Sequence, residues 1–233
     1  MKIKNPYLLV IGLLVFIAGS DLFALDIYVL RHAQTMANWK REYTDEYQRT
    51  FSPWGQDQVD GVADKLEPYS FDVIIVSPAW RTHHTILPYL ARHNRTAEIW
   101  PEVEECCWDR RGFIDIQELP RGPRIEIDEE LQEFFTFRDE EAVYRFGADT
   151  PEAGDYQIGL AVDLIRERFL GTDKTILIVG HTHAGARIIQ GLLDDPPPRL
   201  FLHNATLSHV ALDDDGRFRL HMLNDEPVEE STP

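Results

Sequence analysis

Four basic side chains in this sequence are of the types that bind and attack phosphate. They are Arg31, His32, Arg81 and His181. Arginine offers forked N–H donors that match phosphate oxygens, whereas histidine can donate a hydrogen bond or, when neutral, act as a nucleophile. If the four side chains meet at one point, they form a pocket for a phosphate dianion.

The four residues follow three short apolar segments that have the pattern of buried strands. Residues 26–30, 71–76 and 175–179 are rich in apolar residues and end at polar clusters. A segment with helical character follows each of them, and strands that alternate with helices predict a mostly parallel sheet covered on both faces. Ligands bind beyond the carboxyl ends of the strands in such sheets, so this fold would bring the basic side chains together.

The rest of the pattern predicts one domain, an α/β fold built as a three-layer α/β/α sandwich with a mixed, mostly parallel sheet and a small cap insertion. Ser52 is an N-cap residue and Pro53 takes the first position of a helix that runs to Leu66. Further helices are expected at 79–92 and 154–169, and a closing hairpin at 207–212 and 218–222. The irregular segment 108–153 is expected to be the cap over the site.

The amino terminus has the three-part pattern of a secretory signal peptide. Lys2 and Lys4 precede an apolar run at 7–18, and small residues end the segment at Ser20. Cleavage is expected after Ser20, or as late as Ala24, and an uncleaved anchor stays open as an alternative. We therefore expect an exported, periplasmic or extracellular protein whose domain spans 21–224, followed by an acidic, disordered tail at 225–233.

Charge and cysteine content exclude several classes of function. The formal net charge of −17 repels nucleic acid and anionic membrane surfaces. Cys106 and Cys107 are the only cysteines, and neighbours in sequence rarely reach disulfide geometry, so we expect them to be small apolar residues without a disulfide. Two cysteines without partners at ligand spacing do not predict a zinc site either.

Several motifs of the chain resemble, in the same order, those of the histidine phosphatase superfamily, also called the phosphoglycerate mutase-like family. The motifs are Arg31-His32-Ala33-Gln34-Thr35 with Asn38; Ser52, Gly55 and Gln58; Ser77-Pro78-Ala79-Trp80-Arg81-Thr82 with Thr85; Gly154-Asp155; Val179-Gly180-His181; and Asn204-Ala205-Thr206. So many motifs in the family's order make a specific signal.

The resemblance implies a phosphatase that hydrolyses small phosphomonoesters through a phosphohistidine. It makes His32 the nucleophile, while Arg31, Arg81 and His181 hold the phosphate oxygens, with His181 counted among the catalytic residues. Fixed cations stabilise a transferring phosphoryl group without a metal, and no metal or organic cofactor is implied. We place Asn38 and Thr182 with the substrate-binding residues.

Two departures from the family pattern affect the site. Ala33 stands where the family has glycine, and a methyl group there should leave activity intact. The proton donor of the family is a glutamate followed shortly by glycine, but here Glu104 and Glu105 lead into Cys106 and Cys107 without a glycine. Glu105 has the better register for the catalytic acid, and Glu104 is the second candidate.

Two other functions remain open at this point. A phosphoglycerate mutase-type phosphotransferase would pass the phosphoryl group to a second hydroxyl, and a catalytically silent phosphate-binding or envelope-modifying accessory protein would keep the fold without a working acid. The neighbouring histidines His83, His84 and His183 are expected to be solvated or to support the site without binding the ligand.

Overall fold

The structure is a computed structural model, and it describes residues 24–107, 119–147 and 150–228. The predicted signal peptide and the end of the acidic tail lie outside the described residues. Within the described ranges, no helix combines the length and the apolar character that crossing a bilayer requires.

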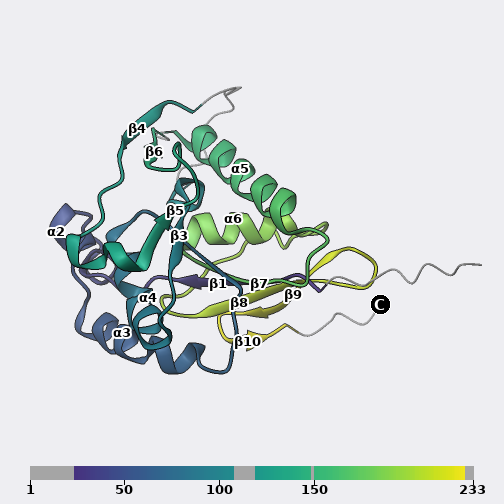
Figure 1. Cartoon of the computed structure of the whole chain (residues 1–233), viewed down its shortest axis with the longest axis horizontal. Helices are drawn as coiled ribbons and strands as arrows, with labels where there is room; N and C mark the ends of the chain where they lie inside the picture. Colours follow the sequence, from purple (N-terminus) through teal and green to yellow (C-terminus); the bar gives the residue numbers. More distant parts are fainter. Residues whose placement is uncertain (1–23, 108–118, 148–149, 229–233) are drawn as a thin grey trace, which may run out of the picture.

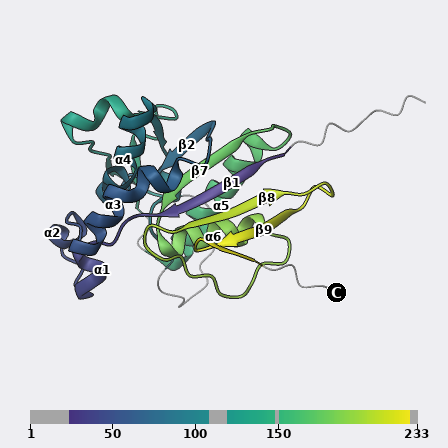
Figure 2. The same cartoon turned by 90° about the horizontal axis from the view of Figure 1, so that it is seen from below.

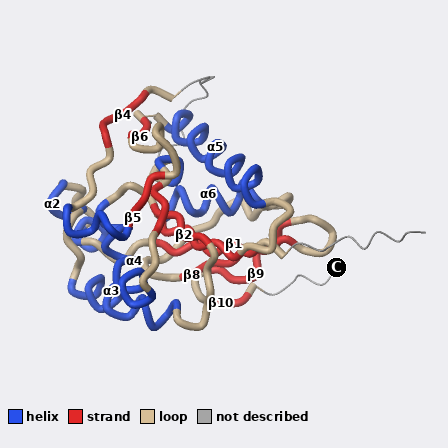
Figure 3. Tube along the Cα trace, in the orientation of Figure 1, coloured by secondary structure: helices blue, strands red, loops and turns tan. Residues whose placement is uncertain are grey.

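A mixed sheet of eight strands forms the middle layer of the molecule (Figure 3). Its strand order is β10-β9-β8-β1-β7-β2-β3-β5, and the strands from β1 to β5 in this order pair in parallel, whereas β8, β9 and β10 pair antiparallel. The bounds are β1 Asp26–Arg31, β2 Val73–Val76, β3 Ala97–Ile99, β5 Phe135–Phe137, β7 Thr175–Gly180, β8 Leu207–Leu212, β9 Phe218–Leu223 and β10 Glu226–Pro227. The three predicted parallel strands and the closing hairpin are confirmed.

Helices cover both faces of this sheet (Figure 1). The longer ones are α3 (Pro53–Leu66), α4 (Trp80–His93), α5 (Pro151–Phe169) and α6 (Thr182–Leu192). Along β7, Ile176 and Ile178 face the core under α5 and α6, while Leu177 and Val179 face the core under α3 and α4. This alternation inside an apolar strand is what a sheet buried on both faces requires.

Local capping chemistry explains where the helices begin. The Ser52 hydroxyl accepts the N–H of Gly55 at 2.9 Å and Pro53 follows it, so α3 starts where the sequence predicts. α5 begins at Pro151, earlier than predicted, because the Thr150 hydroxyl accepts the N–H of Ala153 at 3.2 Å. Two short helices, α1 (Met36–Lys40) and α2 (Asp45–Gln48), lie beyond the carboxyl end of β1 (Figure 2).

The predicted cap is less separate from the sheet than expected. Its described part contains the two-stranded ribbon of β4 (Arg121–Arg124) and β6 (Tyr144–Phe146) and the 3₁₀ helix η2 (Glu129–Phe134). The next element, β5, pairs in parallel with β3 and forms an edge of the main sheet. A short 3₁₀ helix, η1 (Pro101–Val103), follows β3.

Two expectations from the sequence were wrong. The tail predicted to be disordered from 225 begins inside the sheet, because β10 pairs with β9 and the Asp225 carboxylate accepts the N–H of Leu207 at 2.9 Å. Cys106 and Cys107 are joined by a disulfide. The two residues lie in an irregular segment, not a strand, and Cys107 has a left-handed backbone with φ of 66°, so their side chains do not alternate in direction.

His83 is buried, which excludes the solvated position that was one of its two expected roles. Its side chain lies in α4, with its ring centroid 4.5 Å from that of Phe135. Burial is the main reason that the pKa of His83 falls to about 3.

We predict that His83 makes the fold sensitive to mild acid. Below a pKa of about 6.5 the unfolded chain binds a proton that buried His83 does not, so stability falls as the pH falls, by about 2 kcal/mol between pH 7 and pH 5. His83→Gln should remove this loss in urea unfolding measured at pH 7 and pH 5. The exposed His221→Gln is the control, and an unchanged acid sensitivity in His83→Gln would contradict the assignment.

Candidate active site

The register between β1 and β7 brings the two key histidines together. Arg31 lies opposite Gly180, and the N–H of His32 donates to the Gly180 carbonyl at 2.9 Å. The rings of His32 and His181 consequently lie edge to face, with centroids 5.2 Å apart. The predicted convergence of strand ends is therefore present in the structure.

Arg81 connects the two rings and fixes their tautomers. Its Nε donates to Nε2 of His32 at 3.3 Å, and a terminal nitrogen contacts Nδ1 of His181 at 3.2 Å. Because a guanidinium has no acceptor, both ring nitrogens must carry lone pairs. Nδ1 of His32 then donates to the Ala33 carbonyl at 2.7 Å, and Nε2 of His181 donates to the Ser77 hydroxyl at 2.7 Å.

Both histidines are neutral in this environment. Burial, followed by the positive charge of Arg81, lowers the pKa of each ring well below its usual value. A neutral His32 with its lone pair on Nε2 is a nucleophile ready to attack. Its backbone is held from the other side, since the N–H of Ala33 donates to the Thr85 hydroxyl at 2.9 Å.

Arg31 is a buried cation beside this pair. One terminal nitrogen donates to the Leu202 carbonyl at 2.6 Å, and the Phe201 ring lies 5.6 Å from the guanidinium carbon. Burial lowers the pKa of Arg31 to about 10, and its buried Nε has no partner among the described residues. That N–H is a donor suited to an anionic ligand.

The two further predicted substrate-binding residues serve local structure. Asn38 forms a capping box with Thr35, and its Oδ1 also lies 3.3 Å from Nδ2 of Asn204, which donates to the His32 carbonyl at 2.9 Å. The Thr182 hydroxyl donates to the Leu202 carbonyl at 3.1 Å. The structure places Asn38 and Thr182 beside His32 and His181, and their contact with substrate stays a prediction.

The two candidate acids have different surroundings. Oε1 of Glu105 accepts the N–H groups of Ala184, His183 and Cys106 at 3.0, 3.2 and 3.2 Å, so its carboxylate lies at the amino terminus of α6. Burial lowers the pKa of Arg31 and of Arg81. Of the charged groups that raise these two pKa values again, Glu105 has the largest effect. Glu104 instead forms an ion pair with Arg145, which leaves Glu105 as the better placed acid.

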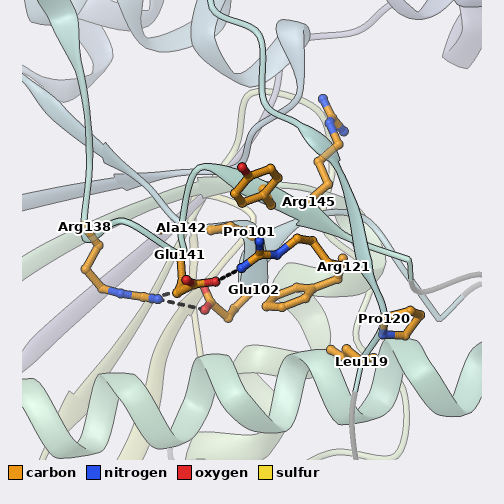
Figure 4. Close-up of a pocket in the computed structure, with 11 residues that line it drawn as sticks. Pro101, Glu102, Leu119, Pro120, Arg121, Arg138, Glu141, Ala142 and Arg145 are labelled. Carbon is orange, nitrogen blue, oxygen red and sulfur yellow. Dashed lines mark hydrogen bonds and ion pairs between the residues drawn. The ribbon is translucent and has the colours of Figure 1, made fainter.

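Arg145 is a site residue that the sequence reasoning missed. It comes from β6, donates to the Pro78 carbonyl at 2.9 Å and contributes to lowering the pKa of His181. A cavity of about 570 Å³ lies next to it, and Figure 4 shows the Arg145 side chain directed away from the paired Arg121 and Glu141 in that cavity. A second cavity of about 280 Å³ lies between Arg145, Pro78 and Arg49. A single arginine in an irregular segment carries no motif that could have identified it.

Comparisons with known proteins agree with this geometry. The sequence matches the family model of the Histidine phosphatase superfamily (branch 1) over residues 27–226, whereas no match was found among curated proteins. The structure is similar to the alpha-ribazole phosphatase from Shigella flexneri, with a TM-score of 0.59 and 18% identity over 88% of this chain and 100% of that one.

Two further solved structures share the fold. A mutant phosphoserine phosphatase from Entamoeba histolytica, in complex with phosphoserine, has a TM-score of 0.56 and 19% identity over 86% of this chain and 96% of that one. A mycobacterial glucosyl-3-phosphoglycerate phosphatase has a TM-score of 0.56 and 17% identity over 85% and 98% of the two chains. At these identities the similarity establishes the fold.

Proposed function

Because the chain belongs to the histidine phosphatase superfamily (branch 1), we propose that it is a phosphomonoesterase that transfers a phosphoryl group from a small substrate to His32 and then to water. The observation that carries this proposal is the contact of Arg81 with both His32 and His181. One cation thereby touches the lone pair of the nucleophile and the neighbouring ring, at the place where a phosphoryl group must lie.

The first step follows from the protonation states. A bound phosphate takes over the donors of Arg81 and the free Nε of Arg31, and its negative charge favours protonation of His181, which then donates from Nδ1. Nε2 of His32 attacks phosphorus, the bond between phosphorus and the leaving oxygen breaks, and that oxygen receives a proton. In the second step water attacks phosphorus, and neutral His32 leaves.

In this proposal Glu105 supplies and recovers the proton. Its Oε1 is occupied by backbone N–H groups, so Oε2 is the atom that can exchange a proton with the leaving oxygen and then with water. Oε2 lies 3.6 Å from Nδ1 of His183, which is half exposed and gives a route for protons to and from solvent.

The substrate of the chain is expected to be selected by the region around Arg145. The related structures are named for different phosphorylated compounds, so the choice of leaving group belongs to each protein separately. Arg145 lines both of the described cavities, so a leaving group that extends from the site toward Arg145 would meet them. A panel of phosphorylated metabolites tested on the purified protein would identify it.

We predict that a wild-type preparation releases inorganic phosphate from simple phosphomonoesters and that His32→Ala abolishes this release. Arg81→Ala should keep the nucleophile and lose about a hundredfold in rate, because one well-placed charged donor contributes on the order of 3 kcal/mol to the transition state. Exposed Arg92→Ala, on the far part of α4, is the matched control and should behave as wild type.

Two outcomes of that assay would support other functions. Formation of a phosphorylated isomer of the substrate without free phosphate would indicate a mutase. Binding of phosphate or vanadate without turnover of any phosphomonoester would indicate an accessory protein. Near-normal turnover in His32→Ala would end the phosphohistidine proposal.

A second prediction tests the acid. Glu105→Gln keeps the size of the side chain and removes the transferable proton, so it should slow an alkyl phosphate, whose alkoxide leaves poorly, by roughly 10² to 10⁴. Nitrophenyl phosphate needs no proton on its leaving group and should lose far less. Glu104→Gln is the matched control, and equal losses on the two substrates in Glu105→Gln would show that Glu105 only shapes the pocket.

We also propose that the protein is exported, on the support of the signal-like segment before Asp21. The mature chain should then begin near Asp21 or Leu25. Amino-terminal sequencing of the protein from its native host checks this, and an intact Met1 on a cytoplasmic protein would contradict it.

A further inference from the structure

Hydrogen bonds hold the segment that carries Glu105 to both α5 and α6. Nε2 of Gln157, on α5, donates to the carbonyls of Glu102 and Glu104 at 3.3 and 3.0 Å. Glu105 itself binds the first turn of α6, as described above. The segment therefore bridges the beginnings of two helices, and the Cys106–Cys107 disulfide closes it directly after Glu105.

The disulfide is buried against helix α5. Cys106 and Cys107 are 1% and 9% exposed and pack against Gly154 in the first turn of α5. A Cβ on Gly154 would lie 2.8 Å from Cβ of Cys106 and 3.0 Å from Sγ of Cys107, closer than side-chain atoms approach one another. The glycine is required because the bridged pair lies against the helix backbone.

We propose that the Cys106–Cys107 disulfide is a positioning element for Glu105, and that its reduction lowers the phosphatase activity by releasing the Glu105 carboxylate from α6. This inference rests on the proposed function, and it concerns residues that act through Glu105 and do not touch the substrate.

The chemistry of the change is simple. A dithiol reductant gives two electrons and two protons, the S–S bond breaks, two thiols form, and the dithiol becomes a disulfide. The two sulfur atoms must then separate to a non-bonded distance, on a side where both cysteines lie close against the backbone of Gly154. We therefore expect the segment at Cys106 and Cys107 to move. Reduction also opens the ring that the disulfide closes between these neighbouring residues, and this ring holds the left-handed backbone of Cys107.

Movement of this segment would affect Glu105 through the backbone N–H of Cys106. The N–H of Cys106 is one of the three donors to Oε1 of Glu105, and the other two belong to His183 and Ala184. A shift at Cys106 therefore weakens the whole set of hydrogen bonds that places the carboxylate. The hydrogen bonds of His32 and Arg81 within the described residues do not involve the disulfide, so the nucleophile should keep its geometry.

The experiment compares the full-length protein before and after treatment with dithiothreitol, with thiols counted by alkylation and mass spectrometry. Reduction should lower kcat on an alkyl phosphate by roughly tenfold or more, a part of the 10² to 10⁴ that general acid catalysis supplies, and lower kcat on nitrophenyl phosphate much less. The double variant Cys106→Ser/Cys107→Ser should behave like the reduced protein and not respond to dithiothreitol. This variant also covers the case in which the buried bond resists the reductant.

The decisive experiment removes the disulfide in the Glu105→Gln variant. If the disulfide acts through Glu105, its loss should add nothing to Glu105→Gln, whereas a general structural effect would lower the rate again. Equal losses on both substrates, or an additional loss in Glu105→Gln, would overturn the proposal.

A readout without turnover separates this proposal from the proposed function. Amide hydrogen exchange at His183 and Ala184 should be slow in the oxidised protein and faster after reduction, because Glu105 is the acceptor of both N–H groups. Unchanged exchange in a fully reduced protein would overturn the positioning role even if no phosphomonoester is hydrolysed. Faster exchange with no turnover would support the role and count against the phosphatase.

Discussion

The contact of the Arg81 guanidinium with two buried, neutral imidazoles is the interaction on which the site depends. A cation placed between two rings keeps both of them unprotonated on the side that faces it, and burial acts in the same direction. The β1–β7 register supplies the two rings, and the first turn of α4 supplies the cation. β1 and β7 end at the two histidines and α4 carries the arginine, so all three elements are needed to form this contact.

Three acidic residues after β3 show how the surrounding segment is organised. Glu102 is buried and binds Arg138 with two hydrogen bonds of 3.0 and 3.1 Å, Glu104 pairs with Arg145, and Glu105 binds the amino terminus of α6. Each carboxylate thus has its own partner, and Glu105 is the one whose charge also acts on Arg31 and Arg81. The disulfide directly follows Glu105 in this loop, where the family pattern has a glycine.

Much of the fold could be predicted from the sequence because its signals are local or follow from topology. The apolar pattern of β7 and the Ser52-Pro53 start of α3 depend on neighbouring residues alone. His32 and His181 could be brought together because parallel strands end at one edge of a sheet.

The features that were missed depend on contacts distant in sequence or on a single turn. β5 is a strand of three residues whose place in the sheet is set by β3. The Cys106–Cys107 bond occurs with a left-handed backbone at Cys107, a conformation that has no sequence signal outside glycine and asparagine. Arg145 is held beside the site by contacts distant in sequence, since it lies in the β4–β6 ribbon and donates to the Pro78 carbonyl.

The most direct test of the phosphohistidine mechanism is to locate the phosphoryl group on the protein. After a rapid quench with a phosphomonoester, ³¹P NMR of the denatured protein and mass spectrometry of its peptides can identify the labelled residue and distinguish the two ring nitrogens. We expect a phosphohistidine at His32 on Nε2, because Nδ1 donates its hydrogen bond to the Ala33 carbonyl. A phosphoryl group on Nδ1, on His181 or on no residue at all under conditions of turnover would contradict it.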